Sequence, residues 1–491
     1  MRSNIRNLII VVVCIAVLGG ALLTLKLTGN DQAVSSAVSS AASIELVSKK
    51  SEDVVSMTVE NEKGSYTIVP IQKSAVSSSS QTSSESVSSS ASSNTEDEIT
   101  YTIKELSGCP INTSAAESVV RNGFSLVASK NLGTVSNLAD YGLDNPQATV
   151  KVRFKDGSSY DYKIGNSSPT NSSAYYMCGL NSDNVYIVSV DKGLLEGPEY
   201  FVSREILSLS ESGDENNFTK ITLSGANYPE TVTLTADEKS MKISSPANYE
   251  VDPDKLSAMK SALTSLTASD VVAVNPNETA LEQYGFKNPT AVAAFSVNGK
   301  DYTLTAGAQD GDNYYVMLDG VNVVYKASSS SIEAWALQNL FALRSKIILM
   351  PNIETVKSLT IVAGETENVL NIERTKNEEK STEDKTYYDY TLTGNGGKSL
   401  DYETNYKKFY QKLIGTSILE DAKEKPAGEP VLTVKYQYFD DSKTDIIEFY
   451  QSGDRRYTAV LNGQVFGIVT QEDVDTLVQG ITALENGQDV S

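Results

Sequence analysis

Alternation of apolar and polar residues predicts a β-hairpin at the start of three separate regions of the chain. The three segments read VVSMTVENEKGSYTIV from Val54, NFTKITLSGANYPETVTLTA from Asn217 and TVKSLTIVAGETENVLNIER from Thr355. Apolar residues alternate with polar ones on both sides of a central turn, which is typical of two antiparallel strands with one buried face. The recurrence of this pattern indicates an internal repeat.

A helix is predicted downstream of each hairpin, because apolar residues there recur at helical spacing behind a start signal. Ser114 and Glu117 form a capping-box pattern, Asp252-Pro253 offers an N-cap followed by proline, and Thr404 is the expected cap of the third helix. Further helices are predicted from SSIEAWALQNLFAL and QEDVDTLVQGITALE, which close the second and third regions.

The motif YG-x-x-x-P marks the same point in the first two regions. It consists of Tyr141, Gly142 and Pro146 in the first region and of Tyr284, Gly285 and Pro289 in the second. Each glycine suits the left-handed position that ends a short helix, and the proline prevents the helix from resuming. The two tyrosines are expected to pack in equivalent places.

Downstream of the motif the correspondence continues. Tyr175 matches Tyr314, and FVSR, which ends at Arg204, matches FALR, which ends at Arg344. We expect these arginines to fix a helix end or a buried carboxylate rather than to bind a ligand. A third, eroded copy reads PVLTVKYQYF from Pro430 but has no YG before the proline.

We therefore expect an α+β fold made of three tandem degenerate modules of antiparallel hairpins plus helices, after one N-terminal transmembrane helix. The modules are placed at residues 44–205, 206–350 and 351–491, the third being the degenerate one. In the first module the Ser-rich residues 74–95 are expected to form a disordered loop, because they lack apolar side chains to pack.

The N-terminal residues have the pattern of a membrane anchor. Arg2 and Arg6 precede an apolar run from Leu8 to Leu25, which is long enough to nearly span a bilayer. Residues 1–27 are therefore interpreted as a cytoplasmic N-terminus and signal anchor, with residues 28–43 as a Ser-rich spacer. This predicts a single-pass protein of the cell membrane with the bulk of the chain extracytoplasmic. A cleaved signal peptide is the alternative.

The amino-acid composition limits which partners the protein can bind and which reactions it can catalyse. The formal net charge of −22 argues against nucleic acid as a partner, and the chain contains no histidine, the commonest general base and zinc ligand. Cys109 and Cys178 form one disulfide in an oxidising compartment or remain two free thiols, and both alternatives stay open.

Taken together, the YG-x-x-x-P motif, the IG step at residues 160–165, the YY and VY segments and the terminal arginine resemble a bacterial family known as domain of unknown function 4340. The resemblance covers residues 135–205 and 278–346, and the second copy departs from it by reading TAG at Thr305–Gly307. It implies a single-pass surface protein. Some members are encoded beside gliding-motility-type ABC-transporter components, which implies a transporter-accessory role. The family supplies no catalytic residues.

Candidate catalytic patterns are weak. S-x-x-K occurs at Ser189–Lys192 and Ser257–Lys260, but the partner motif KTG is missing. The paired carboxylates of Asp440-Asp441 suit a solvated turn better than glycoside hydrolysis, and residues 310–313 lack the calcium-loop spacing. We expect no catalytic, cofactor-binding or metal-binding residues, and we interpret the protein as a non-enzyme. A hydrolase is the least favoured alternative.

Two functional hypotheses follow. The first is a membrane-tethered extracytoplasmic binding or scaffold protein, with an ABC-type permease or another membrane protein as the expected partner. The second is a cell-wall or surface-polysaccharide binder, suggested by the Ser-rich spacer and by 26 tyrosines against one tryptophan.

Overall fold

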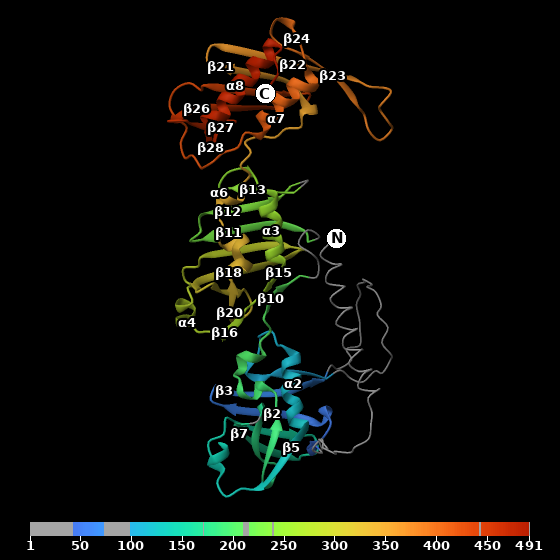
Figure 1. The fold of residues 1–491 in the computed structure, drawn as a ribbon, viewed down its shortest axis with the longest axis vertical. Coiled ribbons are helices and arrows are strands. Elements are labelled where there is room, and N and C mark those ends of the chain that lie inside the picture. Colours follow the sequence, from blue (N-terminus) through green and yellow to red (C-terminus); the bar gives the residue numbers. More distant parts are fainter. Residues whose placement is uncertain are drawn as a thin grey trace, which may run out of the picture. The chain divides into compact units, whose positions relative to one another are not determined.

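The computed structural model describes residues 43–72, 99–169, 171–209, 216–237, 240–440 and 443–490 (Figure 1). The predicted signal anchor, nearly all of the predicted spacer and the predicted Ser-rich loop lie outside these ranges. None of the helices in these ranges has the length and apolar character needed to cross a membrane. By its contacts the chain divides into two compact units, residues 1–63 with 118–195 and residues 64–117 with 196–491.

The predicted α+β class is wrong, because antiparallel β-sheet dominates the described residues. Strands account for 49% of them and helices of all kinds for 23%, in four sheets. Part of this strand content lies where a helix passes directly into a strand that the sequence pattern did not reveal. Helix α2 (Thr113–Phe124) runs into β5 (Ser125–Thr134), and α3 (Pro253–Thr264) runs into β15 (Ser265–Thr267).

In the first unit, neighbouring strands follow the order β1-β5-β9-β8-β7-β6-β2. Their bounds are β1 (Ile44–Ser48), β2 (Val54–Asn61), β6 (Ala148–Phe154), β7 (Ser159–Ser168), β8 (Asn171–Gly179) and β9 (Ser182–Ser189), with β5 as given above. Apolar side chains alternate along β6 with a burial pattern of every second residue, as the hairpin analysis predicts for a half-buried strand.

The second unit holds β3 (Gly64–Gln72) paired with β4 (Ile99–Ile103), β10 (Glu205–Ser208) paired with β15, and a nine-stranded sheet. In spatial order the strands of that sheet are β14 (Tyr249–Glu250), β13 (Met241–Ser245), β12 (Tyr228–Ala236), β11 (Phe218–Gly225), β17 (Ala291–Val297), β18 (Lys300–Asp310), β19 (Asn313–Leu318), β20 (Val323–Ser328) and β16 (Asp270–Val274). Helices α3 and α5 (Ser329–Ala336) pack together, and Trp335 of α5 is fully buried.

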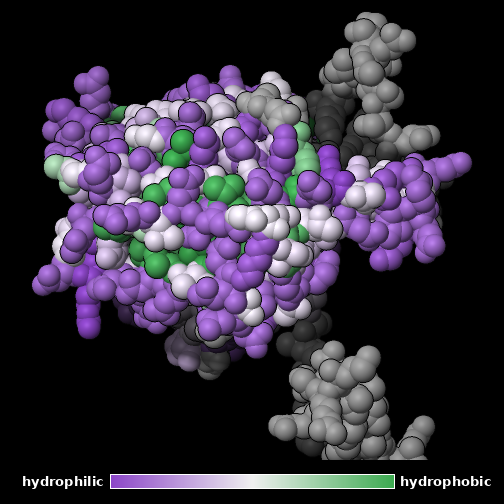
Figure 2. Space-filling view, turned by 90° about the horizontal axis from the view of Figure 1, so that it is seen from above, coloured by the Kyte–Doolittle hydropathy of each residue, from purple (hydrophilic) through white to green (hydrophobic). Residues whose placement is uncertain are grey.

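The second unit also contains an eight-stranded sheet. In spatial order its strands are β24 (Ser399–Leu400), β23 (Tyr388–Thr393), β22 (Thr366–Lys376), β21 (Val356–Ala363), β25 (Leu432–Tyr438), β26 (Thr444–Gly453), β27 (Arg456–Leu461) and β28 (Gln464–Thr470). Helices α7 (Lys407–Gly415) and α8 (Gln471–Asn486) pack against each other over this sheet (Figure 1). On the face shown in Figure 2, hydrophilic residues prevail and hydrophobic ones show through only in small areas, because most large apolar side chains are buried.

One strand order recurs along the chain. The first unit contains β2-β6-β7-β8-β9-β5, the nine-stranded sheet contains β11-β17-β18-β19-β20-β16, and the eight-stranded sheet contains β21-β25-β26-β27-β28. In each run the first strand of the early hairpin pairs with the strand that opens the later hairpin. Three sheets are therefore built on one topology, which agrees with the repeat read from the sequence.

The segment that precedes each sheet pairs with the residues that follow a helix. Strand β1 pairs with β5 through Val47↔Leu126 and Ser48↔Ser125, and β10 pairs with β15 through Leu207↔Leu266 and Ser208↔Ser265. Both pairings begin at the residue after a helix and run in the same register. The eight-stranded sheet has a shorter equivalent, the bridge Ile347↔Ser417 after α7.

Helix starts follow the predicted chemistry at one of three sites. Asp252 caps α3 by accepting hydrogen bonds from the amides of Asp254 and Lys255. The expected Ser114 cap is replaced by Asn112, whose side chain accepts from Ala115 N. The expected Thr404 cap is replaced by Asp401, which accepts from the amides of Thr404 and Asn405. Acceptors two and three residues upstream of the expected caps thus begin these helices earlier.

A column of tyrosines fills the core beside α7. The rings of Tyr402 and Tyr406 stack at 5.2 Å, and those of Tyr406 and Tyr410 lie 5.8 Å apart. The buried hydroxyls of Tyr402, Tyr406 and Tyr436 have no hydrogen-bond partner in the described part of the chain. Burial raises the pKa of each of these phenols above its ordinary value.

Replacing Tyr406 by phenylalanine removes one unpaired buried hydroxyl, so we expect the free energy of unfolding at pH 7 to rise by about 1 kcal/mol. Because the folded pKa is raised, the folded state keeps a proton that the unfolded state releases above about pH 10, and stability falls as the pH rises further. The variant should therefore lose less stability than the unmodified protein between pH 10 and pH 11. Urea denaturation at both pH values measures this.

The matched control is Tyr387→Phe, at a side chain that is 40% exposed. It should change neither the stability at pH 7 nor the alkaline loss. Destabilisation by Tyr406→Phe at pH 7 would show that this hydroxyl has a hydrogen-bond partner.

Candidate functional site

The YG motif forms a tight turn against a neighbouring strand. The short helix η3 (Leu138–Tyr141) ends at Gly142, which has the expected left-handed conformation (φ 68°). A Cβ atom on Gly165 of β7 would lie 2.2 Å from Tyr141 O, so only glycine fits there. The IG step is therefore the partner of the YG turn, which explains why the two occur together.

The second copy forms the same YG turn, although some of its residues differ. Helix α4 (Glu278–Gln283) is followed by Gly285 with φ +82°, and a Cβ atom on Gly307 would lie 2.2 Å from Tyr284 O. The TAG that departs from the family pattern thus keeps the one glycine that the packing requires. Tyr284 packs against Tyr315 with ring centroids 4.7 Å apart, as Tyr141 packs against Tyr176 at 4.8 Å. These tyrosines pack against other rings and are half-buried.

Pro146 and Pro289 follow these turns and precede β6 and β17. The backbone of Pro289 accepts a hydrogen bond from Ala226 N at 3.1 Å, next to the turn of the β11–β12 hairpin. The tyrosine, glycine and proline of each YG-x-x-x-P motif thus help to position the strand that follows, β6 or β17.

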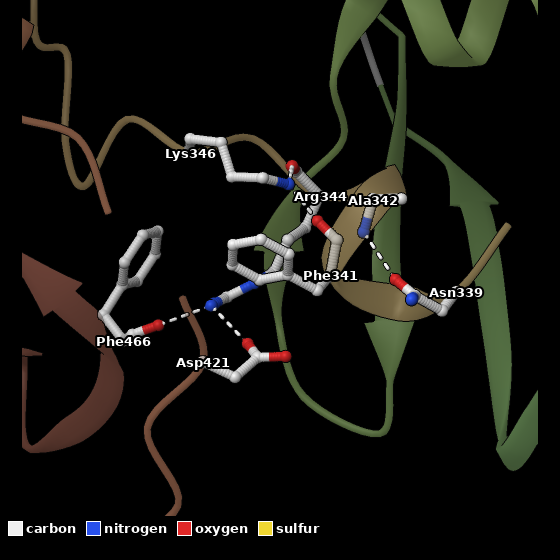
Figure 3. Close-up of polar contacts among 7 residues, drawn as sticks. All are labelled: Asn339, Phe341, Ala342, Arg344, Lys346, Asp421 and Phe466. Carbon is white, nitrogen blue, oxygen red and sulfur yellow. Dashed lines mark hydrogen bonds and ion pairs between the residues drawn. The ribbon is translucent and has the colours of Figure 1, made fainter. Parts of the chain in front are cut away.

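Arg344 is the one terminal arginine that the structure buries. It follows helix α6 (Leu340–Leu343), and its side chain is 1% exposed. Its Nη2 donates to Asp421 Oδ1 at 2.6 Å and to the Phe466 carbonyl at 2.7 Å (Figure 3). We expected a buried carboxylate, but here the arginine is the buried partner and Asp421 is 54% exposed.

Three aromatic rings surround the Arg344 guanidinium. Its Cζ lies 4.5 Å from the ring centroid of Tyr249, 5.1 Å from that of Phe466 and 5.4 Å from that of Phe341. Stacking on ring faces offsets part of the desolvation of the charge, for which a weakly hydrated, planar guanidinium is better suited than an ammonium group. Burial lowers the pKa of Arg344, and the Asp421 carboxylate opposes this shift.

The residues around Arg344 come from two different sheets. Tyr249 belongs to β14 of the nine-stranded sheet, whereas Phe466 belongs to β28 of the eight-stranded sheet. Backbone hydrogen bonds connect the same elements: Ser345 N donates to Glu250 O at 2.8 Å, and Ile418 N donates to Lys346 O at 2.9 Å. Arg344 therefore lies at a joint between the two sheets. We call Arg344, Asp421 and the three rings the arginine joint.

Lys346 adds a second cation to this joint. Its Nζ donates to the carbonyl oxygens of Arg344, at 2.9 Å, and of Phe341. Burial lowers the pKa of Lys346, and the neighbouring Arg344 charge adds to the shift. Lys346 also lies 4.0 Å from the Phe341 ring centroid, so this ring contacts both cations.

Arg204 forms the equivalent ion pair with an aspartate, but this pair is exposed to solvent. Its Nη2 donates to Asp270 Oδ1 at 3.3 Å, and the two side chains are 60% and 62% exposed. Asp270 and Asp421 occupy matching positions in SLTASD and TSILED, each after a helix. The structure thus pairs each predicted arginine with an aspartate that we did not predict, and these two segments are the signal that would have revealed it.

A groove of about 1410 Å³ lies beside the arginine joint, between the nine-stranded and eight-stranded sheets. Its apolar lining includes Tyr249, Val251, Phe466, Tyr438 and Phe439, together with the connecting segment 347–351. Its charged lining consists of Asp237, Lys242, Glu250, Arg374, Asp440, Lys443 and Asp445. The groove thus combines aromatic rings with charges of both signs, which suits binding of a ligand or partner.

Some charged side chains of the groove form ion pairs or hydrogen bonds with each other, and others do not. Lys242 lies 2.9 Å from Asp237 and 3.2 Å from Glu250, and the Tyr438 hydroxyl donates to Asp445 at 2.7 Å. By contrast, Arg374 stacks on the rings of Phe439 (3.9 Å) and Tyr388 (4.7 Å). Within the described ranges, neither Arg374 nor Lys443 forms an ion pair.

The remaining candidates stay apart from this groove. Cys109 is buried and Cys178 is half-buried, both are free thiols, and burial raises the pKa of each. Of the two alternatives left open above, the structure contains the free thiols. In the described ranges, no three His, Cys, Asp or Glu side chains are grouped closely enough to hold a metal ion.

We expect Arg344→Gln to lower the free energy of unfolding by about 3 kcal/mol, because it removes a buried cation, two hydrogen bonds and three ring contacts. The matched control, Arg204→Gln, removes an exposed pair and should cost less than about 1 kcal/mol. Chemical denaturation of the full-length protein measures both values. Equal losses for the two variants would contradict the structural difference between the two pairs.

Comparison with known proteins finds one family. The family described as Domain of unknown function (DUF4340) matches residues 101–243 and again residues 242–420. Two consecutive matches confirm that the chain contains a repeated family unit. No curated protein and no solved structure matches the chain.

Proposed function

The chain belongs to the DUF4340 family, and from that premise we propose that it is a membrane-tethered extracytoplasmic protein that binds a partner and acts as a scaffold. Residues 1–27 supply the tether, with the N-terminus cytoplasmic. The observation that carries the proposal is the groove beside the arginine joint, which combines apolar rings with charged side chains.

The architecture supports a scaffold. A run of strands with one topology recurs in three sheets, and each preceding segment pairs with residues that follow a helix. In repeat proteins such units build extended binding surfaces, because each unit contacts only its neighbours. The arginine joint holds two sheets together, so that a groove built from both keeps its shape.

The proposed partner is a membrane protein. A single tether near the bilayer places the groove within reach of the extracytoplasmic parts of other membrane proteins. The family resemblance makes an ABC-type permease the specific candidate, since some relatives are encoded beside such transporters. A catalytic role is not proposed, because the sequence has no histidine and lacks KTG, a partner motif of S-x-x-K segments.

A cell-wall or surface-polysaccharide binder is the second candidate. The groove presents the rings of Tyr249 and Phe439 beside the carboxylates of Asp440 and Glu250. Rings that stack on sugars next to hydrogen-bonding carboxylates are a common arrangement in carbohydrate recognition. The apolar connecting segment 347–351 on the same lining favours the protein partner.

Chemical crosslinking of the full-length protein in its own cells, followed by mass spectrometry of the captured proteins, tests the proposal. We expect subunits of a membrane transporter to be captured. A matched strain in which residues 1–27 are replaced by a cleaved signal peptide should lose this capture, because the tether is gone. Retention of the protein in the wall fraction without any membrane protein would favour the second candidate instead.

A further inference from the structure

The floor of the groove is apolar and partly exposed. The connecting segment contributes Ile347, Leu349 and Met350, and Met350 is 65% exposed, the most exposed of the large apolar side chains in the described ranges. Exposed apolar residues next to buried rings are typical of a contact surface. A bound segment that covers Met350 would be stabilised by the removal of this apolar surface from water.

Two cations on the lining have no carboxylate partner among the described residues. Lys242 is already neutralised by Asp237 and Glu250, but Arg374 and Lys443 make no ion pair in the part of the chain that the structure describes. The Arg374 guanidinium lies over the rings of Phe439, at 3.9 Å, and Tyr388, at 4.7 Å. Such stacking leaves the edge of the guanidinium available for donating to a carboxylate in the bidentate manner.

The surrounding charge limits what the groove accepts. The protein has a net charge of −22, and Asp440 and Asp445 also line the groove. A polyanion would be repelled by this field, whereas a ligand with one or two carboxylates would gain the contacts with Arg374 and Lys443 without a large repulsion. The apolar floor disfavours a sugar chain and favours aliphatic or aromatic side chains.

Building on the proposed function, we propose that the groove binds a short peptide segment of the partner that carries apolar side chains next to a carboxylate. The apolar side chains cover Met350 and Leu349, and the carboxylate pairs with Arg374 and Lys443. An acidic polysaccharide would be a different occupant, and the test below distinguishes it from the peptide.

A photo-reactive amino acid at position 350 of the full-length protein, followed by ultraviolet crosslinking in cells, identifies what lies in the groove. We expect a crosslink to a protein segment whose sequence, read by mass spectrometry, contains apolar residues and an Asp or Glu. The same amino acid at position 387 is the control, because Tyr387 is 40% exposed but does not line the groove. It should give no such crosslink.

Charge reversal tests the role of the two cations. Arg374→Glu combined with Lys443→Glu should lower the yield of the position-350 crosslink at least tenfold. The matched control is Lys425→Glu, which reverses a cation that lies 4.4 Å from the Tyr450 ring centroid and does not line the groove. This control should leave the yield unchanged.

A synthetic peptide with the captured sequence gives a second readout. Replacing its Asp or Glu by the amide should weaken binding to the full-length protein about tenfold in fluorescence anisotropy, as expected for loss of a charged hydrogen bond. A crosslink to a segment without a carboxylate, a crosslink to a glycan, or an unchanged yield after charge reversal would overturn the inference.

The outcomes separate this inference from the proposed function. If chemical crosslinking of the whole protein captures a membrane protein but position 350 captures nothing, the scaffold role stands and the groove is not its contact. If neither captures a membrane protein, both proposals fail.

Discussion

A buried positive charge organises the contact between the nine-stranded and eight-stranded sheets. Arg344 is almost fully removed from water, and its charge is met by one carboxylate, one carbonyl and three aromatic rings. An unpaired arginine in this position would be strongly destabilising, so the sheets keep their contact only if Asp421, in the segment after α7, and Phe466 of β28 meet Tyr249 of β14. The groove depends on the same contact, because Tyr249 and Phe466 line it.

Comparison with the exposed Arg204–Asp270 pair shows how burial changes the contribution of the Arg344–Asp421 pair to stability. Both arginines follow the same motif and pair with an aspartate at the equivalent position, but the exposed pair has no ring contact among those described. Exposed ion pairs contribute little to stability, whereas buried ones are costly to break. The repeat thus contains the same Arg–Asp pair twice, once exposed and once buried. The buried pair, which contributes more to stability, lies beside the groove.

Much of this arrangement could be predicted from the sequence, because it depends on local patterns. The alternation from Val54, Asn217 and Thr355 predicted the early hairpins, and the left-handed glycines Gly142 and Gly285 followed from their place after a short helix. The equivalence of Arg204 and Arg344 was also visible. These features need only the chain's own periodicity and turn chemistry.

The features that the sequence did not reveal depend on contacts between distant segments. Strand β5 contains Ser, Lys and Asn at exposed positions and follows a helix without a break, so its alternation was too weak to recognise and the α+β class was wrong. Asp421 is one acidic residue among many, and only the fold places it beside Arg344. The same holds for Arg374 on β22 and Phe439 just after β25, which are distant in the sequence and meet only in the fold.

Hydrogen exchange at the joint tests the central claim most directly. The amides of Ile418 and Leu419 donate to Lys346 O and Ile468 O, and so connect the segment after Arg344 to β28. If the arginine joint makes the two sheets one cooperative unit, these amides should exchange with the same free energy as the core strands β21 and β25, and Arg344→Gln should release them selectively. Fast exchange of these amides in the unmodified protein, as in a frayed connection, would contradict the account.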